Sequence, residues 1–446
     1  MKKYYKIFVL IIIFFALFLR FYKLGIIPSG LDWDEISNSY NAYSILKTGR
    51  DEYNKLLPLY NRSFDDYKPP LYMYLEIPSV AYFGLTPFAA RLPSALVGTI
   101  TTIFIYLLVK RLFKKENFAI VAMLMAAISP WQLQFSRVGF EANVGLFTTV
   151  VSFTLLLYSL TLDNEILSTK KKILFIASAI FFGLTFYTYH AERIFIPLLF
   201  ITTSIIYKKE FLKIPKKYLI IFIVLVIAII APFFVFSPNQ AISQRFQETS
   251  TKSQMNDINT SIKFIEEDNT SLPAKIIHNR RIIILQGYLQ HYMANLDINY
   301  LFIKGDDNMR HHLDNMGMLY LIELPFLLYG LFIVIKEKSK PILFILSWLL
   351  LSPIAAAPTD VAPHAIRSYT LVVALEIIIT LAIVDIYNKI KWKRTYLIVI
   401  VCGFYLTFFT YLENYYTHYS YDHSTWWQFG YLDAVAKTQE LKNQYN

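Results

Sequence analysis

The chain has 446 residues, of which 55% are hydrophobic, 17% are aromatic and only 17% are charged. A typical soluble domain carries roughly 25% charged residues, so this composition excludes an ordinary soluble protein. The formal net charge of +11 does not indicate nucleic-acid binding, because the Lys and Arg residues stand in short clusters between apolar runs. The single cysteine, Cys402, excludes a disulfide framework and a cysteine-based metal site.

Long apolar runs recur over almost the whole chain, and helices of that length cross the ~30 Å hydrocarbon core of a bilayer. The sequence therefore predicts an all-α polytopic membrane protein with about eleven transmembrane helices. The first run is too long for the apolar region of a signal peptide, so we expect an uncleaved first helix. The predicted spans are residues 7–24, 91–109, 118–136, 142–162, 173–189, 194–207, 218–236, 318–335, 341–357, 365–388 and 395–412.

Residues 70–85 decide the topology. If this segment lies along the membrane interface, every strong basic cluster falls on the side of the N-terminal lysines, as the positive-inside rule requires. Lys68-Pro69-Pro70 opens the segment, and Glu76 and Pro78 lie inside it, which suits an interfacial helix. We therefore expect a cytoplasmic N-terminus and an outer C-terminus. The basic clusters lie at residues 110–115, 170–172, 208–217, 336–340 and 389–394.

With this topology, residues 1–412 form a transmembrane catalytic domain and residues 413–446 a short outer tail. Residues 25–90 form the first outer loop and residues 237–317 a second large one. In the second loop we expect a mobile polar stretch at 237–280 and an interfacial helix at 280–296. The unusual polar residues fall on the outer side, whereas the helix centres are almost free of charge, which argues against a transporter.

The most unusual polar motif is Asp32-Trp33-Asp34-Glu35, directly after the first span. Three carboxylates in four residues repel one another, and such a cluster persists when it binds a cation or serves as a base. The alternative is a helix N-cap with acidic residues in the first turn. Charge pattern alone leaves both interpretations open.

For other polar residues of the outer side, the sequence likewise allows either a functional or a structural role. Lys68 suits a lipid phosphate, or it snorkels to the interface. Arg137 and Glu141 flank the next outer turn and could form a structural salt bridge. His190 marks the following turn, where a lone histidine is more often structural.

Two later outer segments are basic. Arg310 precedes His311-His312, and Arg367 closes Pro363-His364-Ala365-Ile366-Arg367. Arginine suits bidentate phosphate binding. A metal-binding histidine pair on a helix face needs i,i+4 spacing, which His311 and His312 lack.

Taken together, an outer carboxylate cluster and several cations match the needs of sugar transfer from a polyprenyl phosphate. Cations stabilise the leaving phosphate, and a carboxylate deprotonates the acceptor hydroxyl. The alternatives are a flippase or transporter of polyprenyl-linked glycans, and a ligase of larger lipid-linked glycans.

Three motifs together resemble a known family: Leu31–Glu35, Tyr67–Tyr72 and Ala90–Ser94. They resemble the protein O-mannosyltransferase-like glycosyltransferases of the GT-C superfamily, which include the lipid A aminoarabinose transferases. The resemblance is strongest over residues 7–195 and continues more loosely at residues 317–326. It implies an inverting transferase of the cytoplasmic membrane, with its active site on the outer face and a single-sugar polyprenyl-phosphate donor. The acceptor is a hydroxyl of a lipid, a glycan or a protein, and no nucleic acid is involved.

The resemblance also implies residue roles. Asp34 matches the catalytic Asp, with Glu35 beside it, and Lys68 matches the residue that holds the donor phosphate. Glu141 matches a second acidic position, where relatives usually have Asp. Arg310 and His311 lie in a loop that supplies phosphate or metal contacts, and Arg367 is a second candidate for the phosphate.

The chain departs from the family in two ways. Tyr67 stands where the aminoarabinose branch has a Glu that helps to hold a metal, which counts against a metal here. The sequence requires no cofactor. The chain also lacks the extra lumenal domains of the mannosyltransferases, so a protein acceptor is not specifically implied.

Overall fold

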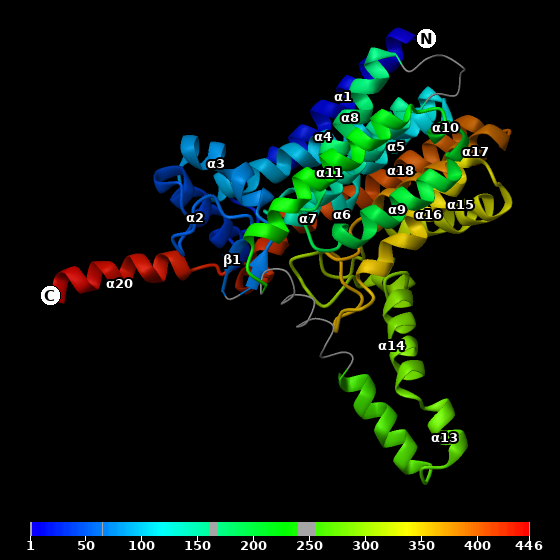
Figure 1. Ribbon diagram of the computed structural model, residues 1–446. Helices are drawn as coiled ribbons and strands as arrows, with labels where there is room; N and C mark the ends of the chain where they lie inside the picture. Colours follow the sequence, from blue (N-terminus) through cyan, green and yellow to red (C-terminus); the bar gives the residue numbers. More distant parts are fainter. Residues whose placement is uncertain (1, 65, 161–167, 240–254, 446) are drawn as a thin grey trace.

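The structure is a computed structural model that describes residues 2–64, 66–160, 168–239 and 255–445. Long helices lie side by side in one bundle, with the N-terminus at one end and strand β1 toward the other (Figure 1). The bundle helices are α1 (Lys2–Phe21), α4 (Pro87–Phe113), α5 (Glu116–Ile128), α6 (Pro130–Ser136), α7 (Glu141–Ser159), α8 (Thr169–Thr185), α9 (Glu192–Ile206), α10 (Lys208–Phe211), α11 (Lys216–Phe236), α15 (Leu324–Lys336), α16 (Lys340–Leu351), α17 (Leu371–Lys389) and α18 (Lys393–Glu413).

A multi-pass membrane protein is confirmed, but eleven crossings are not. Among the described residues, six helices are long and apolar enough to cross a membrane, or seven if the bent pair α5 and α6 forms one span. Every predicted span has a helix, but α8, α9, α15 and α16 contain 17, 15, 13 and 12 residues. At 1.5 Å per residue the shortest covers about 18 Å, which is well below the ~30 Å hydrocarbon core.

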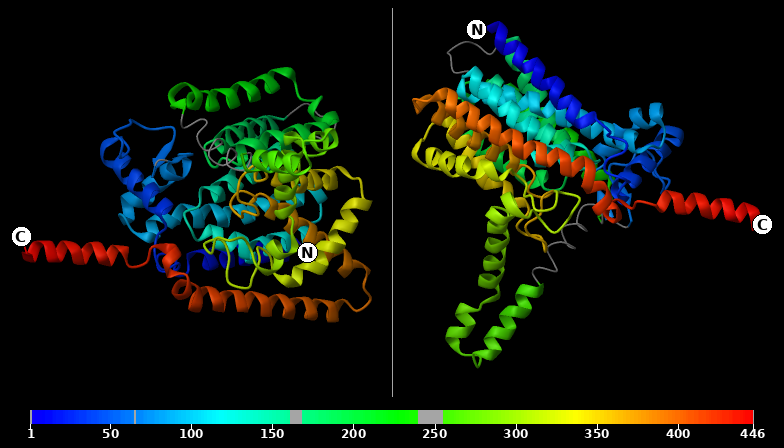
Figure 2. Two further views of the ribbon diagram at one scale, coloured as in Figure 1. Left: turned by 90° about the horizontal axis from the view of Figure 1, so that it is seen from below. Right: turned by 180° about the vertical axis from the view of Figure 1, so that it is seen from behind.

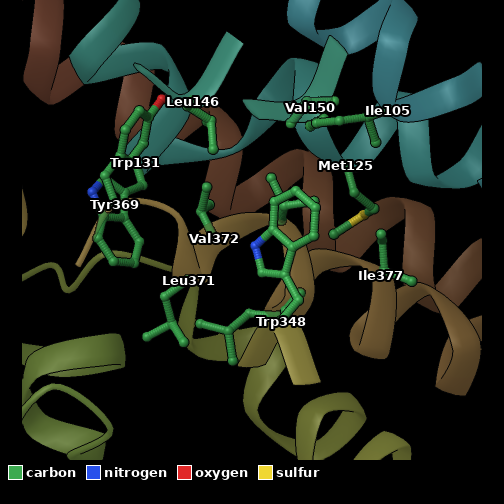
Figure 3. Close-up of a cluster of buried hydrophobic side chains, with 14 of the residues drawn as sticks. Ile105, Met125, Trp131, Leu146, Val150, Trp348, Tyr369, Leu371, Val372 and Ile377 are labelled. Carbon is green, nitrogen blue, oxygen red and sulfur yellow. The ribbon is translucent and has the colours of Figure 1, made fainter. Parts of the chain in front are cut away.

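The core of the bundle is aromatic and aliphatic (Figure 3). Trp131 packs against Tyr369 with 5.8 Å between the ring centroids, and the Trp348 indole N–H donates to the carbonyl of Thr370 at 2.8 Å. Gly330 lets α15 approach α17 closely, because a Cβ at this position would clash with the carbonyl oxygen of Ile378. The bundle is therefore a packed scaffold at its centre.

The expectation of nearly charge-free helix centres has an exception. Glu376, in α17, is buried and accepts a hydrogen bond from Gln132 Nε2 at 2.7 Å. Arg20, in α1, donates to the carbonyls of Ala126 and Ala127 at 3.3 Å. These hydrogen bonds join α17 to α6 and α1 to α5, as buried polar groups in membrane proteins commonly do.

The segment at residues 25–90 folds as a small unit at the end of the bundle. Its helices are α2 (Trp33–Thr48) and α3 (Leu71–Phe83), and between them lie β1 (Asn61–Ser63) and β2 (Asp66–Lys68). The two strands pair antiparallel, with Asn61 opposite Lys68. Helix α3, the expected interfacial helix, packs against α2 and α4. This unit supplies two of the three motifs singled out in the sequence.

The second large segment is more helical than expected. Residues 240–254 of the expected mobile stretch lie outside the described residues, but residues 255–267 are helical and α13 (Leu272–Ile277) follows. A loop was therefore the wrong prediction for this part, because Met255, Ile258, Ile262 and Ile265 repeat at helical spacing within a polar composition. The predicted helix at 280–296 is α14 (Arg280–Ala294), which projects from the bundle with α13 (Figures 1 and 2).

Short elements complete the chain at the site end of the bundle. They are η1 (Asn299–Ile303), η2 (Leu321–Glu323), η3 (Ser352–Ala355), η4 (Asn414–Tyr419), α19 (Ser420–Asp422) and η5 (Ser424–Trp427). Trp427 is fully buried, and a Cβ at Gly30 would clash with its carbonyl oxygen. The first half of the tail therefore packs on the segment after α1, whereas α20 (Tyr431–Tyr445) projects away (Figure 2).

Candidate active site

The acidic motif begins helix α2 with a capping box. Asp32 is the N-cap residue: its Oδ1 accepts from the backbone N–H of Glu35 at 2.8 Å, and Glu35 Oε2 accepts from the N–H of Asp32 at 3.2 Å. This arrangement satisfies two backbone donors that the first turn would otherwise leave open. The helix-cap interpretation is therefore correct for Asp32 and Glu35.

Glu35 is fully buried and holds the site unit to the bundle. Its carboxylate accepts from Arg91 Nε at 2.9 Å and Nη2 at 3.1 Å, and from the N–H of Gly139 at 2.9 Å. Arg91 also donates to the carbonyl of Pro28 at 2.9 Å. Because successive helix residues point about 100° apart, Glu35 faces this buried network while Asp34 faces another way.

Asp34 lies in a cavity of about 210 Å³ at the site end of the bundle. It forms an ion pair with Lys68, which β2 presents from the other side. Burial lowers the pKa of Lys68, but the charges of Asp34 and Glu141 outweigh burial and raise it. Lys68 is therefore a cation at physiological pH. The polar lining of the cavity is Asp34, Asp66, Lys68, Glu141, His190, Asn308, Arg310, His311 and His364.

Glu141 reaches the same cavity from the first turn of α7. Its Oε1 accepts from Asn38 Nδ2 at 3.1 Å, and Asn38 Oδ1 accepts from Asn61 Nδ2 at 2.7 Å. This chain of amides joins α7, α2 and β1. The carboxyl group of Glu141 is thereby fixed in place, with Lys68 near enough to feel its charge.

Arg310 closes the cavity from a loop far along the chain. Its Nη1 contacts Asp32 Oδ2 at 2.9 Å, and its guanidinium lies 4.8 Å from the centre of the Trp33 ring. Burial raises the pKa of Asp32 to about 7; the charge of Asp34 adds to this effect and Arg310 opposes it. Asp32, which has no predicted role, thus positions the Arg310 side chain.

His311 lies beside Arg310 and is fully buried. Its Nδ1 contacts Asp306 Oδ2 at 2.6 Å, and its ring centroid is 5.3 Å from that of His364. Burial lowers the pKa of His311, although Asp306 opposes the effect. Donor atoms of Asp306, His311 and His364 lie within 4.8 Å of one another, a set that fits a metal ion.

Sequence reasoning missed Asp306, His364 and Asp66 as site residues. The metal argument considered only the neighbours His311 and His312, whereas the group that gathers in space joins two separate loops. The motif containing His364 was noted for Arg367 alone. A search for any outer His and Asp, without fixed spacing, would have included all three residues.

Three predicted site residues contact backbone carbonyls of the protein. His190 lines the cavity, but its Nε2 contacts the Tyr67 carbonyl at 3.2 Å, and burial together with Arg193 lowers its pKa to about 3. Arg137 lies outside the cavity and donates to the carbonyls of Leu19 at 2.7 Å and Tyr22 at 2.8 Å. Arg367 is also outside it, with Nη1 3.4 Å from the Val361 carbonyl.

Comparisons with known proteins agree with this architecture. The family described as dolichyl-phosphate-mannose-protein mannosyltransferase matches residues 67–236. An uncharacterized protein of Aquifex aeolicus is 31% identical over 131 residues, which are 29% of each chain. A second uncharacterized protein of that organism is 29% identical over 178 residues, which are 39% of this chain and 32% of the other. The chain thus aligns with less than a third of each curated relative.

Two solved structures share the fold. The oligosaccharyltransferase AglB from Archaeoglobus fulgidus, in complex with an inhibitory peptide and a dolichol-phosphate, matches with TM-score 0.55 and 16% identity over 88% of this chain and 51% of its own. ArnT from Cupriavidus metallidurans, bound to undecaprenyl phosphate, matches with TM-score 0.55 and 13% identity over 89% of this chain and 63% of its own. The resemblance inferred from the sequence is confirmed: the chain has the fold of GT-C superfamily glycosyltransferases, and residues 67–236 match the mannosyltransferase family.

Proposed function

We propose that the protein is an inverting glycosyltransferase of the cytoplasmic membrane. It transfers a single sugar from a polyprenyl-phosphate donor to a hydroxyl acceptor on the outer face. The observation that carries the proposal is one cavity in which a carboxylate, Asp34, meets two cations, Lys68 and Arg310. These residues come from segments far apart in the chain, so the fold gathers them.

The two cations are suited to the leaving group. When the bond between the sugar and the phosphate oxygen breaks, negative charge develops on the polyprenyl phosphate. Lys68 and Arg310 supply N–H donors with full positive charge at that point, and such bonds are roughly twice as strong as neutral ones. Arg310 is already positioned by Asp32 and Trp33, so little reorganisation is needed.

Asp34 is the proposed base. It accepts the proton of the acceptor hydroxyl as the oxygen forms a bond to the anomeric carbon, on the face opposite the leaving phosphate. The configuration at the anomeric carbon is thereby inverted, and the electron pair of the broken bond leaves with the phosphate. A positioned carboxylate in this role contributes about 10²–10⁴-fold to the rate. If a divalent metal is bound at His311 and His364, it supplies further positive charge near the phosphate.

The size of the cavity favours a single-sugar donor over a long glycan. Its volume of about 210 Å³ is below the roughly 300–1,000 Å³ of pockets that enclose drug-sized ligands. A second cavity, of about 610 Å³, lies beyond the loop that carries Arg310. Asn308 and Arg310 line the smaller cavity, whereas Asp307 and Met309 line the larger one, which offers room for an acceptor.

The solved relatives support a lipid-phosphate donor. AglB was determined with a dolichol-phosphate and ArnT with undecaprenyl phosphate. Both ligands carry the phosphate and the polyprenyl chain that the proposed reaction requires.

The proposal is tested by transfer from labelled donors. The full chain is reconstituted in nanodiscs with polyprenyl-phosphate donors that carry radiolabelled hexoses or pentoses, and with a glycolipid extract as the acceptor. Asp34→Asn should lower transfer about 10²–10⁴-fold while binding of undecaprenyl phosphate persists. Asp385→Asn makes the same change far from the cavity, beside Lys389 in α17, and should leave transfer unchanged.

Three results would overturn parts of this assignment. Near-normal transfer by the Asp34→Asn variant would remove Asp34 as the base. Transbilayer movement of the labelled lipid without any product, by wild-type protein, would favour a flippase. Transfer of long glycans in preference to single sugars would favour a ligase.

A further inference from the structure

We propose that a cavity at the end of the bundle opposite the candidate active site binds the headgroup phosphate of an anionic phospholipid. The cavity measures about 310 Å³ and lies among the ends of α4, α7, α10 and α16. It takes no part in the proposed transfer reaction. Lipid binding can be measured whether or not the chain transfers a sugar, so this proposal and the proposed function can fail separately.

The cavity lies at the depth where membrane-crossing helices end. Helices α4 and α7 are both long and apolar enough to cross a membrane. Glu141, the first residue of α7, lines the smaller cavity of the candidate active site, whereas Leu157 and Leu160 near its other end line this one. The 19 residues of α7 span about 28 Å, close to the thickness of the hydrocarbon core. Figure 1 likewise shows α10 toward the end of the bundle away from β1.

Two of the basic clusters in the sequence, residues 110–115 and 336–340, meet at this cavity. Arg111 and Lys114 come from the end of α4, and Lys340 is the first residue of α16. Glu210 is the single carboxylate among the described lining residues. It is buried, and Lys340 Nζ donates to its two oxygens at 2.6 and 2.8 Å. Three cations thus face one carboxylate, an excess of positive charge that favours an anion.

Arg111 is held in place by the end of α7. Its Nε donates to the carbonyl of Leu157 at 2.7 Å, and its Nη2 donates to that of Leu160 at 2.6 Å. The carbonyls at a helix end carry partial negative charge, which would repel an anion if they were left open. Arg111 covers two of them and keeps its own charge. The guanidinium is therefore already positioned before a ligand binds.

Helix α16 begins at the cavity. Its first two residues, Lys340 and Pro341, line the cavity, and the N-cap residue Ser339 makes no capping hydrogen bond with its side chain. The backbone N–H groups of a first turn have no partner within the helix, and the helix dipole places partial positive charge there. Such a helix start favours a phosphate, and Arg111 and Lys114 add full positive charge beside it.

The rest of the lining favours a lipid over a soluble anion. It includes four apolar residues, Leu112, Leu157, Leu160 and Pro341, which suit the glycerol and the upper acyl chain of a phospholipid. A choline or ethanolamine headgroup would add an ammonium group, but Glu210 already accepts from Lys340. Basic pockets between membrane helices bind anionic headgroups in other proteins. The best match is therefore a lipid with net negative charge, such as phosphatidylglycerol.

Native mass spectrometry of the full chain tests the site. The protein in detergent is titrated with dioleoyl phosphatidylglycerol, with dioleoyl phosphatidylcholine, and with inorganic phosphate as a competitor. Each Lys or Arg at a membrane surface contributes about fivefold to the affinity for an anionic lipid. Wild-type protein should therefore bind phosphatidylglycerol at least about tenfold more tightly than phosphatidylcholine.

The variants locate the binding to the cavity. Lys114→Gln should weaken phosphatidylglycerol binding about fivefold, and Arg111→Gln at least as much. Lys115→Gln is the matched control, because Lys115 is the exposed neighbour of Lys114 and does not line the cavity. Its affinity should stay within about twofold of wild type, since salt screens a charge outside the cavity. Lys114 is also exposed, so Lys114→Gln should fold even if Arg111→Gln does not.

Three results would overturn the proposal. Equal affinities of wild-type protein for phosphatidylglycerol and phosphatidylcholine would show that the cavity does not select an anionic headgroup. An equal loss of affinity in Lys114→Gln and Lys115→Gln would assign the binding to the diffuse charge of this end of the bundle. Displacement of bound phosphatidylglycerol by an equimolar amount of inorganic phosphate would make free phosphate the ligand.

Discussion

The two walls of the smaller cavity are built in different ways. The amino-terminal wall carries Asp34, Lys68 and Glu141, which sit in the first turns of α2 and α7 and at the end of β2. The carboxy-terminal wall carries Arg310, His311 and His364, all of which stand outside helices and strands. The first wall is held by regular elements, and the second by side chains that contact loop backbone.

The two walls also differ in how far the family match covers them. The mannosyltransferase family match covers residues 67–236, so it includes Lys68 and Glu141 but neither Asp34 nor the carboxy-terminal wall. We infer that the amino-terminal wall provides the base and the Lys68 contact to the phosphate, while the loop wall adds Arg310 and adjusts the site to its particular donor and acceptor. Substitutions in the first wall should therefore have larger effects than those in the second.

The largest effect is expected on folding, at Glu35. Glu35→Gln leaves the fully buried Arg91 without a counter-charge, and breaking one partner of a buried pair costs about 3–5 kcal/mol. Chemical unfolding of the purified variants should show this loss for Glu35→Gln and a smaller one for Asp34→Asn, because Lys68 keeps the charge of Glu141 nearby. A stable Glu35→Gln protein without transfer activity would instead place Glu35 in the chemistry of the first wall.

The next effect is expected on donor binding, at Lys68. Removing a charged hydrogen-bond donor costs about 1.5–3 kcal/mol, so Lys68→Gln should weaken undecaprenyl phosphate binding by roughly 10- to 100-fold. Lys68→Arg keeps the charge and should restore part of the affinity. If the affinity of Lys68→Gln for undecaprenyl phosphate stays within about twofold of the wild-type value, the phosphate contacts the carboxy-terminal wall alone.

A smaller, pH-dependent effect is expected at Asp32, which joins the two walls. Its pKa is raised from 3.8 to about 7, chiefly by burial. Ionised Asp32 holds Arg310, so transfer should rise as the pH rises through about 7. Asp32→Asn keeps the helix cap, and should remove this rise and lower transfer above pH 7 by roughly fivefold, the equivalent of about 1 kcal/mol.

Stability should depend on pH in the opposite direction at the same residue. Because the folded pKa of Asp32 exceeds its unfolded value, its contribution to stability is fully present below a pH of about 4 and is lost as the pH rises to about 7. Unfolding curves of wild type and Asp32→Asn, compared between pH 4 and 8, check this sign. Identical pH dependence in both proteins would contradict the raised pKa.

The smallest effect is expected in the tail. Truncation after Gly430 removes α20, whose residues Tyr431 and Leu432 are 70% and 76% exposed, and transfer should stay within about twofold of wild type. Truncation before Trp427 should damage the amino-terminal wall, since Trp427 is buried against Gly30 and its ring centroid lies 5.8 Å from Cζ of Arg91, the partner of Glu35. Transfer assays on the two truncations measure the contrast.

The sequence predicted much of the amino-terminal wall, because motif and element coincide there. Asp34 and Lys68 were chosen from local charge and from the family resemblance, and both line the cavity. Glu35 was grouped with Asp34, but adjacent helix positions cannot face the same way, and the capping-box spacing from Asp32 to Glu35 was the signal for its structural place. Arg137 was likewise chosen as a polar residue of an outer turn, but the sequence does not show that its side chain donates to backbone carbonyls.

The carboxy-terminal wall could be predicted only in part, because it depends on contacts between distant loops. Arg310 and His311 were chosen, but Asp306 and His364 meet them only after the chain folds. The predicted number of membrane crossings is not confirmed, for a related reason. Apolar runs mark where helices form, but the length of each helix is set by the turns and short helices at its ends, as at α16 and η3.

A structure with bound polyprenyl phosphate would decide whether the two cations hold the donor. We expect the phosphate in the cavity of about 210 Å³, with Lys68 Nζ and the Arg310 guanidinium each at about 2.7–2.9 Å from its oxygens, and Asp34 facing the sugar position. A phosphate bound outside this cavity, or in contact with neither cation, would show that Asp34, Lys68 and Arg310 do not form the transfer site.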